Sequence, residues 1–390
     1  MTTSVKRSRH AEIAGAGFAG LVTAIALSQR GWTVRVHERA PSLRSEGYGI
    51  TIFPNGERVL RAIGVDQRFR SEAYPVFRHE MRDEHNRVIS APKQDHAFRR
   101  IMRSSLLKIL ADRAEELGVE LHYGSSIVSA SAGGVLIRSD GRHFPADLAI
   151  GADGIFSKVR DSLPIKQKQR MLPDGCWRVV IPRSADADDY ILENGHIEWW
   201  SGRRRCLFGP KDAKEAYFTL VCPFDDERGK AIPIDVESWS EAFPPLAPLF
   251  AHARNVADWD TTMWVRFQLL HLSRWSEGRV ALVGDSAHAM PPNLGQGGLT
   301  AMMNGLALAV ALEDTPVEEA LAKWEARERP LTEHTQRWAL RHSRLSLLPP
   351  FLRSRAIEMT SRIPYLRRRY LRTAHHVPTG TGHLALEASS

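Results

Sequence analysis

The stretch RVALVGDSAHAMPPNLGQGGLTAMMNGLALAVAL, residues 279–312, decides the fold. Its short apolar run at 280–283 predicts a buried strand that Gly284 and Asp285 close. A loop rich in Pro and Gly follows, and the Ala-rich run at 299–312 predicts a buried helix. Unpaired N–H groups at the start of that helix favour negative charge, and Asp285 can accept hydrogen bonds from a ligand hydroxyl. Taken alone, the pattern also fits a tight strand–loop–helix connection with a capping Asp.

The same arrangement opens the chain, where GAGFAG at residues 15–20 matches G-x-G-x-x-G. A predicted strand at 11–14 precedes this loop, and a predicted helix at 21–30 follows it. A β-branched second strand at 33–37 ends at Glu38. Strand, glycine loop, helix, strand and acid together are the fingerprint of a dinucleotide-binding fold.

Each part of this fingerprint has a physical role. Gly15 permits the tight turn, Gly17 lets the backbone approach a pyrophosphate, and Gly20 permits close packing of helix on strand. Glu38 lies where an acid meets the adenosine ribose hydroxyls, and this argues against a 2′-phosphate on the bound dinucleotide.

A second carboxylate at a strand end is found in GADG, residues 151–154. The motif follows a predicted strand at 147–150 and precedes a predicted helix at 157–163, which puts Asp153 at the turn. The alternative is an ordinary Asp-Gly turn. Arg44 either reaches a phosphate or ribose or is a solvated side chain.

The sequence pattern changes in residues 172–273, where strand-like runs alternate with clusters of turn residues. This pattern predicts an antiparallel meander. Six of the ten Trp lie there, which fits a sheet that covers a ligand or, equally, a plain sheet core. Within it, alternation puts Arg205 on the face opposite Arg204, and Tyr217 beyond a short turn shares the face of Arg205. The alternative for 203–205 is a solvated basic hairpin tip.

We therefore expect an α/β protein in four parts. Residues 1–171 and 275–345 are two parts of one dinucleotide-binding domain, and 172–274 is an inserted sheet domain. Residues 346–390 are a basic helical segment and tail. A helical stretch at 317–337 is expected to be interrupted at Pro330.

The composition is that of a soluble globular enzyme, with 43% hydrophobic and 25% charged residues in 390. Neither a membrane-length apolar run nor a secretory leader is evident, and the three Cys show no disulfide or metal pattern, so we expect a cytoplasmic protein. The 16 His show no ligand spacing, and we expect no metal.

The net charge of +8 is concentrated in one segment. Residues 337–375 contain ten Arg and one acid, Glu358, which leaves the rest of the chain near neutrality. Such a segment is either a nucleic-acid patch or a solvated basic face or inter-subunit contact. We expect the second, because no nucleic-acid motif accompanies it.

The motifs at 15–20, 151–154 and 284–298 occur in an order that resembles the single-component FAD-dependent aromatic hydroxylases, the para-hydroxybenzoate hydroxylase-like family. Within it, the match is to members that oxygenate hydroxypyridine carboxylates, and it spans roughly residues 11–330. The resemblance implies a Rossmann-type FAD-binding domain with an inserted antiparallel-sheet substrate domain and a C-terminal helical segment.

The resemblance also implies site residues. The expected FAD contacts are Gly15, Gly17, Phe18, Ala19, Gly20, Glu38, Arg39, Arg44, Arg103, Asp153, Asp285, Gly295, Gly297, Gly298 and Leu299. Among them, Arg44 and Arg103 contact ribose or phosphates, Asp153 lies near the nicotinamide and pyrophosphate region, and Asp285 binds the ribityl chain. On the substrate side, Arg205 and Tyr217 hold the ligand and Pro292 lies in the loop beside it.

The chemistry implied is reduction of FAD by NADH or NADPH, addition of O2 to give a flavin C4a-hydroperoxide, and oxygen transfer to a small aromatic or heteroaromatic acid. No second G-x-G-x-x-G is present, so the nicotinamide coenzyme is expected to bind transiently and not on a Rossmann domain of its own. Separately, we expect a monomer or homodimer. The loop at 291–297 follows the broader family, which leaves the substrate open. The alternatives are a flavin reductase or dehydrogenase without oxygen insertion and a basic nucleic-acid-binding flavoprotein.

Overall fold

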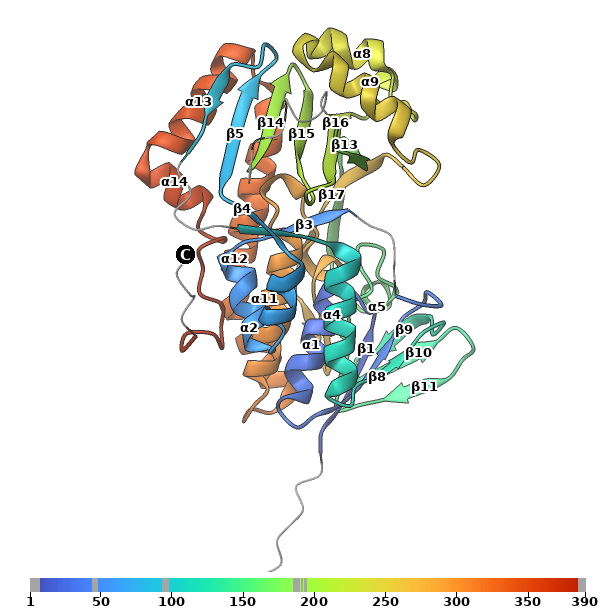
Figure 1. Cartoon of the computed structure of the whole chain (residues 1–390). Helices are drawn as coiled ribbons and strands as arrows, with labels where there is room; N and C mark the ends of the chain where they lie inside the picture. The colour runs from blue at the N-terminus through green and yellow to red at the C-terminus, as the bar shows by residue number, and fades with distance from the viewer. Residues whose placement is uncertain are drawn as a thin grey trace, which may run out of the picture.

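The structure is a computed structural model that describes residues 8–43, 48–92, 98–184, 190, 192 and 195–384. Arg44, a predicted phosphate contact, lies outside the described residues. Figure 1 shows a nucleotide-binding half built around β1, α1 and α11, and a second sheet with upright strands above it.

The first half is built on a six-stranded sheet. In spatial order its strands are β18 (Ser276–Glu277), β19 (Val280–Leu282), β12 (Leu148–Gly151), β1 (His10–Ala14), β2 (Thr33–His37) and β8 (Glu120–His122). The strands from β19 to β8 are parallel, so segments far apart in the sequence bring their carboxyl ends to one edge. This confirms the predicted Rossmann-type sheet.

Two helices pack against a third beside this sheet. Both α4 (Arg103–Glu116) and α11 (Gly297–Ala311) contact α1 (Phe18–Ser28). Residues 18–27 of α1 are all buried, which explains why that helix is apolar on every side.

Shorter elements complete this half. They are β3 (Gly49–Ile52), α2 (Pro54–Ala62), α3 (Asp66–Glu72), β4 (Tyr74–Val76), β7 (Phe98–Met102), β9 (Ile127–Ser131), β10 (Val135–Arg138), β11 (His143–Pro145), α5 (Lys158–Asp161), α10 (Asp285–His288) and η2 (Pro292–Leu294). The small sheet β3-β7-β4 lies between the two halves (Figure 1).

The second half is a seven-stranded sheet. In spatial order its strands are β17 (Val265–Leu272), β13 (Gln167–Pro182), β16 (Glu215–Pro223), β15 (Arg204–Pro210), β14 (Gly195–Ser201), β5 (Arg78–Asp83) and β6 (Val88–Ser90). All neighbours are antiparallel except β14 and β5. The sheet thus takes two strands from residues 78–90, outside the predicted inserted segment, and the four-part division of the chain stays a prediction.

One face of this sheet carries an aromatic core. It is covered by α7 (Glu227–Lys230), α8 (Val236–Ala242), η1 (Pro244–Leu246) and α9 (Ala247–Val256). Edge-on ring contacts join Trp177 to Phe218 and to Trp239, and all three are fully buried. Much of the Trp-rich signal therefore belongs to a plain core, which leaves the opposite face for a ligand.

The C-terminal segment is helical, as expected. It comprises α12 (Val317–Ser343), η3 (Arg344–Leu347), α13 (Pro350–Arg362) and α14 (Pro364–Tyr370). The predicted interruption at Pro330 is wrong, because α12 continues through it. Buried residues on both sides of the Pro, among them Trp324 and Thr335, hold the helix against its neighbours, and this packing outweighs the missing hydrogen bond.

No helix in the described residues combines the length and apolar character needed to cross a bilayer. They also contain no group of three or more His, Cys, Asp or Glu side chains arranged to hold a metal ion.

Candidate functional site

The glycines of the loop after β1 have two different surroundings, because two of them pack against backbone and one faces open space. Gly15 has a φ of 104°, and a Cβ on it would lie 2.4 Å from the Ala152 carbonyl oxygen. A Cβ on Gly20 would lie 2.0 Å from the Gly15 oxygen, so both positions exclude a side chain. A Cβ on Gly17 would meet nothing within 4 Å. Gly17 is the N-cap of α1, so this open space lies at a helix N-terminus that suits a pyrophosphate.

Glu38 is fixed at the end of β2 by the same loop. Its Oε2 accepts a hydrogen bond from the Ala16 N–H at 2.9 Å, and its Oε1 accepts one from the Ala40 N–H at 3.0 Å. The carboxylate is held beside the loop, where the fingerprint puts the ribose, and Arg39 is exposed next to it.

Asp285, Arg103 and Phe18 come together from three elements. Asp285 begins α10 directly after β19, and the Arg103 guanidinium lies over the Phe18 ring, 4.9 Å from its centroid. Burial raises the pKa of Asp285, and the charge of Arg103 acts against that rise. The side chain is nevertheless open to solvent, so it lies in a hollow within the fold. In the part of the chain described, its carboxylate has no hydrogen-bond partner, which fits a contact to ribityl hydroxyls.

The loop after η2 presents donors beside a helix start. Gly295 is left-handed, with a φ of 63°, and Gly297 and Gly298 begin α11, followed by Leu299. Gln296 caps that helix, and its buried Nε2 has no partner. The first turn carries no acidic side chain, so its N–H groups suit the electron-rich edge of a reduced flavin.

The GADG motif precedes a short helix, and its Asp153 accepts hydrogen bonds from the first turn of that helix. The Asp153 Oδ2 accepts hydrogen bonds from the Lys158 N–H at 2.8 Å and the Val159 N–H at 3.2 Å, at the start of α5. Burial raises the pKa of Asp153, and its Oδ1 is buried without a partner. A local capping role is therefore clear, and the expected contact near the nicotinamide and pyrophosphate stays a prediction.

These residues fit FAD. All of the predicted cofactor contacts except Arg44 and Arg39 are drawn together by the carboxyl ends of β1, β2, β12 and β19 and by the N-termini of α1, α4 and α11. Asp153 is among them, because a Cβ on Gly15 would lie 3.1 Å from its Cα. The open space at Gly17, the unpaired carboxylate of Asp285 and the orphaned donor of Gln296 each match a group of the cofactor.

On the substrate sheet, Arg205 and Tyr217 share the face opposite the aromatic core. The register pairs Arg205 with Val221 and Gly209 with Tyr217, so the two side chains are offset by four residues, about 14 Å along the strand. Arg204 lies on the other face, where it bonds Asp226. Arg205 and Tyr217 thus border one surface at opposite ends.

The charge of Arg205 is already balanced. The side chain is only 4% exposed and donates to Glu198 Oε1 at 3.2 Å and to Asn293 Oδ1 at 2.6 Å. Burial acts to raise the pKa of Glu198, but His342, 3.9 Å away, and Arg205 outweigh it and lower that pKa to about 2. Arg205 is therefore no solvated hairpin tip, and it ties the sheet to the loop that contains the exposed Pro292.

Tyr217 is held as a neutral phenol. Its ring lies against Gly49, where an added Cβ would be 2.4 Å from the ring Cζ, and its hydroxyl donates to the Met102 sulfur at 3.0 Å. Burial raises the pKa of Tyr217 to about 12. The Arg100 guanidinium lies 5.3 Å from the centre of this ring.

Between Arg205 and Tyr217 the sheet face is partly open to solvent, and this partly open region is the hollow. Arg178, Leu207 and Thr219 are neighbours on β13, β15 and β16, and all three are only partly buried, whereas Val221 beside them is closed off. Arg178 makes no hydrogen bond or ion pair with any described residue.

Arg100 is a second cation without an acidic partner in the described residues. Its one hydrogen bond there goes to the Pro210 carbonyl at 3.4 Å, and burial lowers its pKa to about 10. The sequence analysis missed both arginines. Strand alternation with Arg205 and Tyr217 would have drawn attention to Arg178, but no local signal marks Arg100, which comes from β7 in the other half.

A family model described as FAD binding domain matches residues 10–339. The chain belongs to this family. A putative 2-heptyl-3-hydroxy-4(1H)-quinolone synthase, AqdB1 of Rhodococcus erythropolis, is 37% identical over 376 residues, 95% of this chain and 97% of that protein. A 6-hydroxynicotinate 3-monooxygenase of Pseudomonas fluorescens is 28% identical over 85% of this chain and 91% of its own.

Solved structures agree with these relatives. The tetrameric form of 2-methyl-3-hydroxypyridine-5-carboxylic acid oxygenase is 36% identical, with a TM-score of 0.84 over 95% of this chain and 97% of its own. The predicted family and fold are thereby confirmed, together with FAD as cofactor and NADH or NADPH as co-substrate. The protein is an FAD-dependent aromatic monooxygenase.

Proposed function

We propose that this monooxygenase oxygenates an N-heteroaromatic carboxylate of the hydroxypyridine type, and that Arg178 and Arg100 hold its carboxylate. The observation that carries the proposal is the presence of these two half-buried guanidinium groups beside one partly open sheet face with no acid paired to either in the described residues.

Charge balance supports this assignment. A buried cation without a counter-charge is costly, so the half-buried Arg178 and Arg100 favour an anionic ligand. A planar guanidinium can hold a carboxylate with two charge-assisted hydrogen bonds. Arg205 already forms an ion pair with Glu198, and its proposed role is to orient the ligand from the opposite end of the hollow.

The rest of the hollow suits an aromatic ring. Leu207 offers an apolar surface and Thr219 a hydroxyl, side by side on the floor. Tyr217, neutral at physiological pH, can turn its single hydroxyl proton from the Met102 sulfur to a ring oxygen. When bound, FAD takes reducing equivalents from NADH or NADPH and passes one atom of O2 to the ring, while the sheet and the loop with Pro292 exclude water.

A neutral 4-quinolone is the second candidate substrate, favoured by the 37% identity to a protein named as a quinolone synthase. The two classes differ in charge, and the hollow distinguishes them. A quinolone without a carboxylate would leave both arginines unpaired.

The test is a screen of NADH and NADPH oxidation and product formation with hydroxypyridine carboxylates, their primary amides and 2-alkyl-4-quinolones. We expect the carboxylates to stimulate oxidation and to be oxygenated. Arg178→Met should raise their dissociation constant roughly tenfold or more, the value of a hydrogen bond to a charged group, with FAD content unchanged.

Arg99→Met is the matched control for Arg100→Met, because Arg99 is its neighbour on β7 and pairs with Glu57 at 3.4 Å. We expect weak carboxylate binding from the Arg100 variant alone. Turnover of quinolones but not carboxylates, unaffected by Arg178→Met, would replace this proposal with the second candidate.

The oligomeric state and the cellular location of this chain are not fixed by its fold and stay proposals. The solved relative is described as tetrameric, whereas a monomer or homodimer in the cytoplasm was expected for this chain from its sequence. Light scattering of the purified protein decides the assembly.

A further inference from the structure

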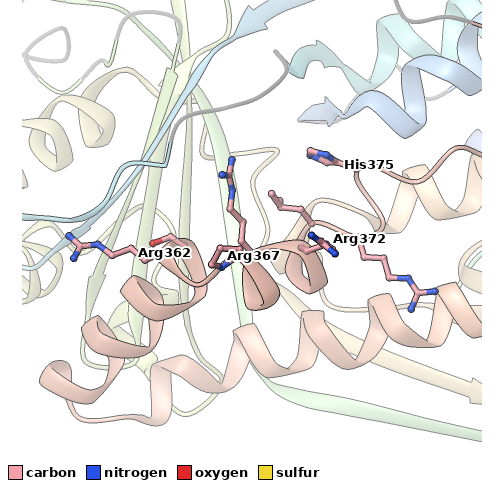
Figure 2. Close-up of a pocket in the computed structure, with 8 residues that line it drawn as sticks. Arg362, Arg367, Arg372 and His375 are labelled. Carbon is pink, nitrogen blue, oxygen red and sulfur yellow. The ribbon is translucent and has the colours of Figure 1, made fainter.

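A cavity of about 500 Å³ lies in the C-terminal segment, outside the site described above. Its lining contains four arginines, Arg362, Arg367, Arg368 and Arg372, together with Ser361, Pro364, Leu371 and His375. Figure 2 shows the side chains coming from the end of α13, from α14 and from the turn that follows it. No acidic side chain is part of this lining.

Part of the positive charge that lines the cavity has no acidic partner among the described residues. Arg362 pairs with Glu358 at 2.9 Å, and Glu358 is the one acid between residues 337 and 375. Arg368 and Arg372 are exposed and make no ion pair or side-chain hydrogen bond within the described residues. Clefts lined by one sign of charge concentrate counter-ions, so this cavity attracts an anion with several charges.

The cavity is joined to the flavin loop by a short chain of contacts. Next to His375, the Ala374 carbonyl accepts a hydrogen bond from the Asn55 N–H at 3.1 Å. The Asn55 side chain donates to Gln296 Oε1 at 2.9 Å, and Gln296 caps α11 at the expected flavin edge. These contacts connect the wall of the cavity to the loop that is expected to receive the flavin.

The reaction requires a polyanionic co-substrate. NADH and NADPH carry a pyrophosphate, and the single G-x-G-x-x-G of the chain is already used for FAD. We propose that the cavity between α13 and α14 binds the phosphate groups of the nicotinamide coenzyme during flavin reduction. Arg is the residue suited to this, because its planar fork matches phosphate oxygens. A volume of about 500 Å³ is large enough for a diphosphate and part of a nucleoside.

The test uses the holoenzyme and the double variant Arg368→Met/Arg372→Met. Arg355→Met is the matched control, since Arg355 is an exposed residue of α13 that pairs with Glu358 at 3.1 Å and does not line the cavity. Calorimetry measures the binding of NAD⁺ and NADP⁺, and stopped-flow absorbance measures flavin reduction at rising NADH or NADPH without aromatic substrate. Both readouts are independent of the substrate assignment.

We expect the coenzyme dissociation constant to rise tenfold or more in the double variant and to stay unchanged in the control. The limiting reduction rate, the FAD content and the affinity for aromatic substrate should not change. Inorganic pyrophosphate should compete with the coenzyme in the wild type and lose that effect in the double variant.

Two results would overturn the proposal. One is an unchanged coenzyme dissociation constant together with lost, salt-sensitive binding of a random DNA oligonucleotide, which would make the cavity part of a nucleic-acid surface. The other is an unchanged constant together with an altered oligomeric state by light scattering, which would make it an interface between copies of the chain.

Discussion

Arg205 and Glu198 form an ion pair at 3.2 Å on the adjacent strands β15 and β14, with side chains only 4% and 6% exposed. Two charges buried this deeply depend on each other, because neither has water to replace its partner. The pair thus belongs to the architecture of the sheet as much as to the substrate surface. Substitutions at either residue will change stability as well as binding.

The first prediction is that Glu198→Gln is strongly destabilising. It leaves the Arg205 guanidinium buried without a counter-charge, which costs about 3–5 kcal/mol in other buried pairs. The double variant Glu198→Gln/Arg205→Met should recover a large part of that loss. Urea unfolding followed by tryptophan fluorescence measures both. A Glu198→Gln protein as stable as the wild type would show that the pair is dispensable.

The same pair predicts an acid dependence. The folded pKa of Glu198, about 2, is below the ordinary value of 4.5. A carboxylate with a depressed pKa contributes stability that is present above 4.5 and is lost as the pH falls toward 2. Between about pH 5 and 2.5 the free energy of unfolding should therefore fall more steeply with pH for the wild type than for Glu198→Gln/Arg205→Met. The same pH dependence in both proteins would contradict this.

The nucleotide-binding half could be predicted from the sequence because its signals are local. The glycine loop, the acid at the end of β2 and the strand–Asp–loop–helix pattern around Asp285 each occupy a few consecutive residues. Gly15 and Gly20 also have local steric reasons to be glycine, and the structure shows them directly. The edge of the parallel sheet then follows from the fixed handedness of such units.

The substrate surface could not be predicted to the same degree, because it depends on register between distant strands. The pairing of Arg205 with Glu198 requires β14 and β15 to meet at a particular offset, and Arg100 arrives from a strand about 100 residues earlier. The path of α12 through Pro330 likewise depends on its burial, which a propensity argument does not include.

The second prediction compares two glycines of one loop. Gly20→Ala puts a Cβ 2.0 Å from a backbone oxygen, so the backbone must shift, and overpacking of this kind costs about 1–3 kcal/mol. Gly17→Ala meets no protein atom and has an ordinary φ of −81°, so stability should be nearly unchanged while FAD content falls sharply. Absorbance at 450 nm and thermal unfolding of the apoprotein separate the two effects. Normal FAD content in Gly17→Ala would remove the pyrophosphate from this position.

The third prediction concerns Asp285, whose pKa is raised by burial. A carboxyl group with a raised folded pKa makes the apoprotein gain stability as the pH falls through that range, because the folded state binds the proton more tightly. Asp285→Asn should remove this gain and leave neutral-pH stability equal or higher. Asp285→Ala should purify largely without FAD. Full FAD occupancy in the Ala variant would refute the ribityl contact.

The last prediction is that the aromatic substrate accelerates flavin reduction. With one dinucleotide fold in the chain, the coenzyme has no Rossmann domain of its own, and reduction without substrate would waste reducing equivalents as peroxide. A ligand in the hollow would contact Arg178 and Tyr217 on the sheet. It would also face the loop of Asn293, which accepts a hydrogen bond from Arg205, so ligand binding can change the position of the loop beside the flavin. We expect stopped-flow reduction by NADH to be at least about tenfold faster with the true substrate, a gain of roughly 1.4 kcal/mol in the barrier. In Arg178→Met the same limiting rate should require a higher substrate concentration, because that variant changes affinity and leaves the coupling intact. Equal reduction rates with and without substrate in the wild type would show that the two sites act independently.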